Sequence, residues 1–359
     1  MRIISGLALA AAVMLLAPTS VMAAEQAKPK PGAACQKKGV TSGDYVCTSR
    51  KGKLVWVVRS STSPVTTKSC TARTVPSGKA AGSNELQPGG QRLRSATSPD
   101  GIVWTRNSDT IVDQAATPSL TRTSDGRPML FMTANQVAGG RDGFAVALGT
   151  ANGLSWTQCS VQLVGFPAGL SGVDPDVVAL PGGGYRVFLT GSIGNGSDRI
   201  GIHYADSPDG FVWTYGGVAF SPVASVLDSM TFRLGDIWHM YVLNQTSMAM
   251  FHATSADGKS FVQQDESERR VDGKAQVLSQ ALMVGDQMRI YGFGSPGQTR
   301  GGWEIRSFVT ADGTTLNGDS RLLLSITGAP SSESVFVKDP AVTQLADGTY
   351  LMVYSTVIP

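Results

Sequence analysis

The sequence predicts an all-β chain that consists mainly of one five-bladed β-propeller, preceded by a small disulfide-bonded module. The composition excludes long charged helices: 359 residues include 42 glycines and 18 prolines, and only 16% are charged, against about 25% in an average soluble domain. A hydrophobic share of 42% excludes intrinsic disorder. One short motif recurs five times along the chain, and this repetition indicates a propeller.

The first residues have the organisation of a secretory signal peptide, which we assign to residues 1–23. A positive start at Arg2 precedes an apolar stretch, 3–16, that is short for a membrane span, and Val-Met-Ala at 21–23 supplies a cleavage pattern. An uncleaved anchor is the alternative. We therefore expect a secreted bacterial protein, in the periplasm, at the cell surface or outside the cell.

Export makes the four cysteines candidates for disulfides. Cys35, Cys47, Cys70 and Cys159 allow three pairings. A Cys35–Cys47 bond would close a short hairpin, and a Cys70–Cys159 bond would then tie the following segment to the main body. Metal ligation is the competing interpretation, but no Cys-x-x-Cys or nearby histidine supports it.

Positive charge is concentrated in a small module at residues 24–59. Residues 25–59 hold eight Lys/Arg against two acidic residues, net +6, whereas residues 60–359 hold 21 basic and 25 acidic residues, net −4. The module could hold the protein near anionic wall polymers or a membrane surface, or it could be a solvated leader. The Ser- and Thr-rich residues 60–85 are interpreted as a linker. The total charge of +3 gives no reason to expect nucleic acid as a partner.

The repeated motif, Ser/Thr-x-Asp/Asn-Gly-x-x followed by a large apolar residue, marks the outer hairpin of each blade. Its copies start at Ser98, Thr150, Ser207, Ser255 and Thr310, so the intervals are 52, 57, 48 and 55 residues, the length of a four-stranded blade. Asp-Gly between alternating apolar runs predicts a hairpin, because the turn needs a positive φ. We expect the aromatic residue after each turn to pack between blades.

Two inner strands precede each later hairpin, which predicts residues 86–359 as the propeller. The strand pairs are 118–121 with 128–133, 174–178 with 185–190, 228–232 with 237–242, 280–284 with 288–292, and 339–343 with 350–355. The last pair has no outer hairpin after it, and the first hairpin, 91–105, has no inner strands before it. We expect these halves to complete one blade, so that the N-terminal hairpin closes the ring.

The starts of the five inner strands are expected to ring one mouth of the central channel. They are Thr117, Asp174, Asp228, Gln280 and Asp339. Asp176 should point to the same side as Asp174, because side chains alternate along a strand. Loops on the same face are expected to bring further candidates, which are Arg141, Arg199, Arg300, Glu304 and Glu333.

Carboxylates that converge in a cleft raise one another's pKa values, which separates acid from base roles. Glycoside hydrolysis needs such a pair, so Asp174, Asp228 and Asp339 are candidate catalytic residues, with Glu304 and Glu333 as further candidates. Asp176, Gln280, Arg141, Arg199 and Arg300 are candidate substrate-binding residues. The alternatives are ordinary strand-start residues at a wet channel mouth, or a structural cation. We expect no cofactor.

Five repeats, Asp-Pro at inner-strand starts and Ser-x-Asp-Gly-x-x-Trp hairpins resemble the five-bladed glycoside hydrolases of the arabinanase, β-xylosidase and fructosidase group. The resemblance covers residues 86–359 and implies Asp174 as general base and Asp228 as the carboxylate that tunes it. The implied acid position coincides with Gln280, which cannot donate a proton usefully, so Glu304 or Glu333 would supply the acid. Sialidases are less similar, because their hairpin box has one more residue between Asp and Gly.

The sequence therefore predicts a secreted, monomeric, carbohydrate-active propeller, with glycoside hydrolysis favoured. The alternative is a non-catalytic propeller that binds glycan or a cell surface. Two channel carboxyls about 5–10 Å apart, one of them a Glu or a desolvated Asp, would support hydrolysis.

Overall fold

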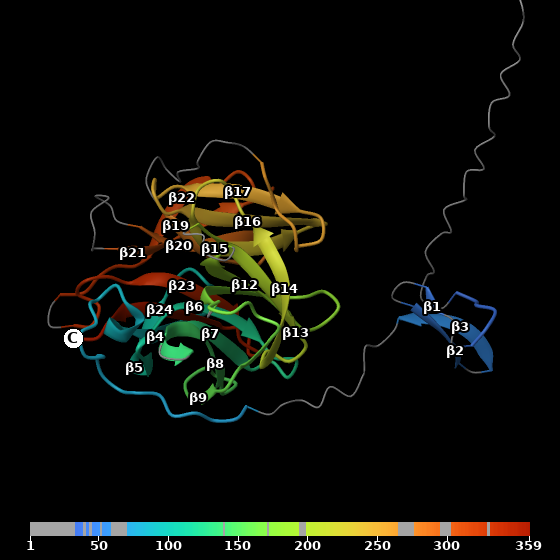
Figure 1. The fold of residues 1–359 in the computed structure, drawn as a ribbon, viewed down its shortest axis with the longest axis horizontal. Helices are drawn as coiled ribbons and strands as arrows, with labels where there is room; N and C mark the ends of the chain where they lie inside the picture. Colours follow the sequence, from blue (N-terminus) through green and yellow to red (C-terminus); the bar gives the residue numbers. More distant parts are fainter. Residues whose placement is uncertain are drawn as a thin grey trace, which may run out of the picture. The chain divides into compact units, whose positions relative to one another are not determined.

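The computed structural model describes residues 33–38, 41–42, 45–50, 52–58, 70–138, 141–170, 172–193, 199–264, 276–294, 303–328 and 331–359. The chain divides into two compact units, one up to Pro64 and one from Val65 (Figure 1). The predicted signal peptide and residues 60–69 of the predicted linker lie outside the described residues. No helix among the described residues is long and apolar enough to cross a membrane.

The small unit is a three-stranded antiparallel sheet in the order β1 (Thr41–Ser42), β2 (Tyr45–Arg50) and β3 (Lys53–Val58). Gly52 takes a positive φ of 76° between the last two strands, which glycine adopts without steric cost. A disulfide joins Cys35 to Cys47, and Cys47 lies opposite Trp56 on β3. A unit this small buries little apolar surface, so the covalent bond substitutes for a core.

The larger unit contains five sheets of four strands, with one short additional strand. The blades are β6 (Ala115–Arg122), β7 (Pro128–Ala138), β8 (Arg141–Gly149) and β9 (Trp156–Cys159); β11 (Val173–Ala179), β12 (Tyr185–Ser192), β13 (Ile200–Ser207) and β14 (Val212–Phe220), with β10 (Gln162–Val164) added at its edge; β15 (Val226–Leu234), β16 (Ile237–Asn244), β17 (Met250–Ser255) and β18 (Val262–Gln263); β19 (Val277–Val284), β20 (Gln287–Gly294), β21 (Glu304–Thr310) and β22 (Asn317–Leu324); and β23 (Lys338–Gln344), β24 (Tyr350–Val357), β4 (Gln91–Ser98) and β5 (Thr105–Asp113). We number them blades 1 to 5 in this order. The predicted all-β, five-bladed arrangement is confirmed.

Both ends of the larger unit contribute to blade 5. Strand β24 pairs antiparallel with β4 over eight residue pairs, from Tyr350 opposite Ser98 to Val357 opposite Gln91.

A second disulfide joins Cys70 to Cys159. The segment before the short 3-10 helix Pro88–Gly90 is thereby tied to the outer edge of blade 1, where Arg73 N–H donates to the Gln158 carbonyl at 2.9 Å.

Each repeated Asp-Gly turn is held by its own side chains. In the first copy, Ser98 Oγ accepts the N–H of Gly101 at 2.8 Å, and Asp100 Oδ1 accepts the N–H groups of Ile102 and Val103, both at 2.8 Å. The copies that begin at Ser207, Ser255 and Thr310 repeat this pattern. Such local hydrogen bonds explain why the motif needs Ser or Thr, Asp and Gly at this spacing.

The turns also connect neighbouring blades. Arg186 of blade 2 donates to the Gly258 carbonyl of blade 3 at 3.0 Å, and Tyr241 of blade 3 donates to the Gly313 carbonyl of blade 4 at 2.9 Å. A Cβ added at Gly258 would lie 2.8 Å from the Trp238 indole. Glycine is therefore needed here for close approach as well as for its φ of 68°.

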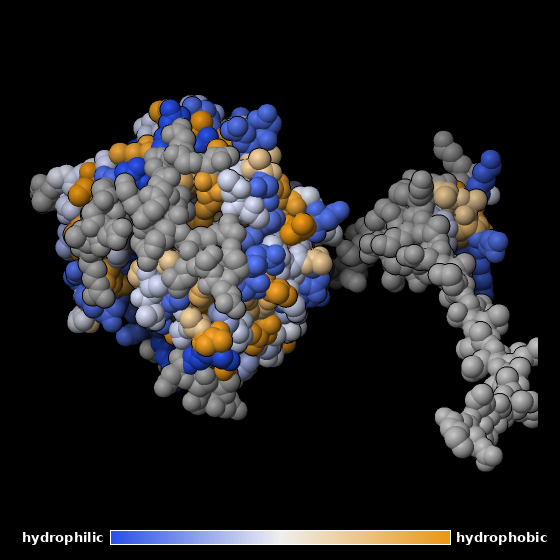
Figure 2. Space-filling view, turned by 90° about the horizontal axis from the view of Figure 1, so that it is seen from above, coloured by the Kyte–Doolittle hydropathy of each residue, from blue (hydrophilic) through white to orange (hydrophobic). Residues whose placement is uncertain are grey.

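Hydrophobic clusters between adjacent blades form the core. The aromatic residue after each turn lies in these clusters, as Trp213 illustrates: it is fully buried and contacts Phe131 and Phe144 of blade 1 edge-on, at 5.6 and 5.4 Å between ring centroids. On the face shown in Figure 2, hydrophilic and hydrophobic side chains are interspersed over the described surface of this unit. Scattered exposed apolar residues of this kind are normal for a folded protein.

We expect Gly258→Ala to destabilise the propeller by about 1–3 kcal/mol more than Gly235→Ala. Both residues have a positive φ, but a Cβ at Gly235 would meet nothing within 4 Å. Gly235→Ala therefore measures the backbone cost alone, and the difference measures the contact between turn and blade. Chemical denaturation of both variants checks this, and equal losses of stability would contradict it.

Candidate functional site

The mouth of the channel is shaped by one backbone irregularity that four blades share. Thr117, Asp174, Asp228 and Asp339 each lie in the first strand of a blade with φ between 47° and 52°. At each of them the pairing with the second strand shifts by one residue, which is a β-bulge. Asp tolerates the left-handed region better than most residues, and a bulge re-aims the side chain. Three carboxyl groups and one hydroxyl therefore line one cavity.

Neighbouring blades hold this ring in place by hydrogen bonds. The backbone N–H of Asp174 donates to Thr133 Oγ1 of blade 1 at 2.8 Å, and Thr117 Oγ1 donates to the same atom at 2.7 Å. The N–H of Thr117 in turn donates to Ser355 Oγ of blade 5 at 3.2 Å. The strained residues are thus fixed by side chains from the preceding blade. The cavity that they line has a volume of about 30 Å³, enough for a water molecule.

The predicted place of Gln280 in this ring is wrong. Gln280 lies opposite Tyr291, just as Asp176 lies opposite Phe188, so the two occupy the same position in blades 4 and 2. Leu278, two residues earlier, lines the mouth for blade 4. Blade 4 has an insertion at Ser279 without a positive-φ aspartate, and the sequence pattern conceals this shift in register.

Asp176 is also not on the side that the alternation rule predicts. The bulge at Asp174 interrupts the alternation. Asp176 consequently lines a different cavity, at the end where the first strands finish, together with Gln280. The structure therefore separates these two residues from the three aspartates of the mouth.

Burial and mutual repulsion set the charges of the mouth carboxyls. Burial, followed by the charge of Asp339, raises the pKa of Asp174 to about 6, although the Thr190 hydroxyl and the Lys338 ammonium oppose the rise. Burial, with the charges of Asp174 and Asp339, raises the pKa of Asp228 well above its ordinary value. Both carboxyls therefore favour the protonated form more than an ordinary aspartate does.

Lys338 is a site residue that sequence reasoning missed. Its ammonium forms a buried ion pair with Asp339 and lies 5.9 and 5.6 Å from the ring centroids of Phe293 and Phe336. Lys338 directly precedes Asp339 in the sequence. A lysine among apolar strand residues was the signal that could have identified it as a site residue. A buried cation beside three carboxyls compensates part of their charge.

The two glutamates do not line the mouth cavity. Glu333 is buried, with Oε2 at 2.5 Å from Arg106 Nε and Oε1 at 3.3 Å from Arg94 Nη1, and Oε1 accepts the Tyr354 hydroxyl at 2.7 Å. Both oxygens of Glu333 are therefore occupied by Arg94, Arg106 and Tyr354, away from the mouth cavity. Glu304 begins β21 and lies 3.3 Å from Arg306 Nη2.

The two described arginines among the predicted substrate-binding residues do not lie at the mouth cavity. Arg141 begins β8 and is exposed, and Arg199 is exposed with Nη2 donating to Ser221 Oγ at 3.3 Å. Neither lines the mouth cavity. Arg300 lies outside the described residues.

The structure offers no cluster of ligands for a metal ion within the part of the chain that it describes. No group of three or more His, Cys, Asp and Glu side chains there has a suitable arrangement. His239 and His252 instead contact each other, with Nδ1 and Nε2 3.1 Å apart, inside blade 3.

The chain forms an all-β ring of five blades with carboxyls at one channel mouth, so its class is the five-bladed β-propeller. No family model and no curated protein matches the sequence. Solved structures do match the fold. A provisionally assigned glycoside hydrolase from Parabacteroides distasonis aligns with a TM-score of 0.50 at 17% identity, over 68% of this chain and 86% of its own. A provisionally assigned glycosidase from Bacteroides thetaiotaomicron aligns with a TM-score of 0.51 at 14% identity, over 67% and 86%. The chain thus has the fold of glycoside hydrolase propellers.

We expect Asp174→Asn to stabilise the protein more at neutral than at acidic pH. The carboxyl ionises near 3.8 in the unfolded chain and near 6 in the folded one. Its contribution to stability therefore falls as pH rises between these values, and above them the folded state bears the cost of a buried charge. Asparagine removes this cost, on the order of 1–3 kcal/mol.

Unfolding by urea on both sides of this pH range, about 3 and about 7.5, measures the effect. The matched control is Asp347→Asn in an exposed turn, where the Thr349 hydroxyl lowers the pKa of the carboxyl, so the pH dependence should have the opposite sign. A stability difference between Asp174→Asn and wild type that is constant with pH would contradict the assignment.

Proposed function

We propose that this protein is an exported glycosidase whose reaction takes place at the Asp-lined channel mouth. The observation that carries the proposal is that two carboxyls with raised pKa values share one cavity: burial raises the pKa of Asp174 to about 6 and that of Asp228 well above its ordinary value. Hydrolysis of a glycosidic bond needs one carboxyl to give a proton and another to accept one.

In this proposal Asp228 is the general acid and Asp174 the general base. Protonated Asp228 would protonate the leaving oxygen, while ionised Asp174 would take a proton from the attacking water. This revises the acid predicted from the resemblance, because neither Glu304 nor Glu333 lines the cavity. The volume of about 30 Å³ suits the water and not a sugar ring, so the sugar would lie outside the cavity.

Asp339 and Lys338 complete the site as an ion pair. An ionised Asp339 raises the pKa values of Asp174 and Asp228, and Lys338 lowers both. The charge of Asp339 would therefore help to keep Asp228 protonated, and the charge of Lys338 would help Asp174 to ionise at neutral pH.

The small unit supports a location outside the cytoplasm. Its disulfide and the Cys70–Cys159 disulfide are typical of oxidising compartments, and Lys37, Lys38 and Lys53 are exposed. We propose that the basic residues of 25–59 bring the protein to anionic wall polymers or to a membrane surface.

We expect Asp174→Asn and Asp228→Asn each to lower kcat by about 10²–10⁴-fold. A set of aryl glycosides and plant or wall polysaccharides provides the substrates, because the sugar and linkage are to be found by the screen. Asp236→Asn, at a fully exposed carboxyl, is the control and should retain full activity, and Glu304→Gln tests the alternative acid.

Unchanged turnover in Asp174→Asn would reject the site. Turnover lost in Glu304→Gln but retained in Asp228→Asn would return the acid role to Glu304. Glycan binding without turnover by the wild type would favour the alternative, a non-catalytic propeller.

We expect Lys338→Met to move the acidic limb of the kcat/KM profile to higher pH. The ammonium lowers the pKa of Asp174, so its removal leaves the base protonated over a wider range. Lys338→Arg keeps the charge and should restore the wild-type limb. A merely structural lysine would lower activity equally at every pH, and that result would contradict this role.

A further inference from the structure

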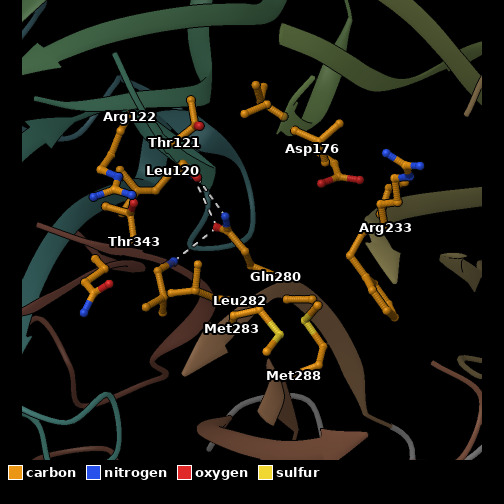
Figure 3. Close-up of a pocket in the computed structure, with 18 of the residues that line it drawn as sticks. Leu120, Thr121, Arg122, Asp176, Arg233, Gln280, Leu282, Met283, Met288 and Thr343 are labelled. Atoms are coloured by element: carbon orange, nitrogen blue, oxygen red, sulfur yellow. Dashed lines mark hydrogen bonds between the residues drawn. The ribbon is translucent and has the colours of Figure 1, made fainter. Parts of the chain in front are cut away.

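The channel contains a second cavity that the proposed hydrolysis does not use. This lower cavity has a volume of about 800 Å³ and lies where the first strands of the five blades end, lined by residues 120–124, 176–179, 231–233, 280–283 and 342–344 (Figure 3). The size falls within the usual range for small-molecule sites. Its lining includes none of the mouth aspartates.

Gln280 lies in the channel beside the lower cavity, and the linings of the two cavities share no residue. Its amide Nε2 donates to the Leu120 carbonyl of blade 1 at 2.7 Å, and its Oε1 accepts the N–H of Val342 of blade 5 at 3.1 Å (Figure 3). One side chain of blade 4 thus spans the channel and binds two other blades. A molecule in the lower cavity would not contact the mouth carboxyls.

Two buried polar atoms in the lower cavity form no hydrogen bond of good geometry, although Thr231 lies close enough to lower the pKa of Asp176. They are Asp176 Oδ2 and Thr231 Oγ1, whose residues are 5% and 4% exposed. In Figure 3 the carboxyl of Asp176 points into the cavity. Leaving such buried groups without good hydrogen bonds is unfavourable, so a ligand that hydrogen-bonds to them would gain binding free energy.

The chemistry of these groups matches sugar hydroxyls. Burial raises the pKa of Asp176 well above its ordinary value, which favours the neutral carboxyl, and a neutral carboxyl can donate and accept like the Thr231 hydroxyl. A sugar hydroxyl also does both. An aliphatic ligand would pack against Met283 and Met288 but would leave Asp176 and Thr231 unpaired.

The charge of the lining indicates an acidic sugar. Its charged residues are Arg122, Arg233 and the buried Asp176. Arg233 Nη2 lies 2.9 Å from the exposed Asp236, and such exposed pairs contribute little. The guanidinium of Arg122 is exposed and lies on the opposite side of the cavity from Asp176 in Figure 3, where it could bind a carboxylate through two hydrogen bonds.

We propose that the lower cavity binds a sugar that carries a carboxylate, with its hydroxyls toward Asp176 and Thr231 and its carboxylate toward Arg122. Met283 and Met288 and the indole of Trp238 line the same space and would contact the apolar faces of the sugar ring. The site is independent of hydrolysis at the mouth, because the two cavities share no lining residue.

Methionine methyl groups report on this cavity. In the full-length protein labelled with ¹³C-methyl methionine, we expect galacturonate to shift the Met283 and Met288 signals in a saturable manner, and galactose to bind about 10-fold more weakly or not at all. Arg122→Gln should remove the preference for galacturonate, and Asp176→Asn and Thr231→Val should each weaken binding of both sugars. Asp174→Asn, at the mouth, is the matched control and should leave these shifts unchanged.

Any of the following outcomes would overturn the proposal. No shift of either methyl, equal binding of the two sugars, or shifts that disappear in Asp174→Asn would each exclude an acidic-sugar site here. Tighter binding of hexanoate than of galacturonate would identify the cavity as a site for anionic amphiphiles instead. Because these measurements need no turnover, their failure is distinct from failure of the glycosidase proposal.

Discussion

In four of the five blades, the first strand has one residue in the left-handed region just inside the channel mouth. The site depends on this conformation. In a regular strand, alternate residues would point to opposite faces, whereas here blades 2, 3 and 5 each direct a carboxyl to the same cavity. The bulge turns Asp174, Asp228 and Asp339 inward at one level. Such a backbone is unfavourable for a non-glycine residue, and it persists because Thr133 and Ser355 of neighbouring blades bind it. The ring of blades is therefore what maintains the geometry of the site.

The sequence could predict whatever depends on local chemistry. The turn motif contains its own hydrogen-bond partners, as Ser98 and Asp100 show, so its spacing identified the repeats and the blade number. The approximate place of Asp174, Asp228 and Asp339 followed from that repeat. The errors concern register. Whether Gln280 or Leu278 lies at the mouth depends on the pairing with β20, and whether Asp176 shares a side with Asp174 depends on a bulge. Both are non-local properties that a strand pattern does not contain.

The electrostatics of the mouth are unfavourable for stability and favourable for chemistry. Burial and neighbouring carboxyls raise the pKa values of Asp174 and Asp228, with Lys338 as one compensating ammonium, and a fold selected only for stability would replace such groups by apolar residues. Charged side chains elsewhere in this chain have direct partners. Arg186 and Asp206 form a bidentate pair at 2.7 and 2.9 Å beside a turn, and Glu333 is held by Arg94 and Arg106. The contrast between satisfied and unsatisfied charges separates structural pairs from the candidate site.

The two ends of the channel differ because one position in the repeat has different side chains in different blades. Ser119 accepts the N–H of Val177 in the next blade at 2.9 Å, and Gln280 does the same for Val342. Blade 5 has Ala341 at this position, which offers no acceptor, and the longer Gln280 side chain also reaches Leu120. One side chain of blade 4 thereby satisfies the backbone of two other blades beside the lower cavity. Ligands at the two ends can then be recognised by separate groups, carboxyls at one end and Arg122 with Asp176 at the other.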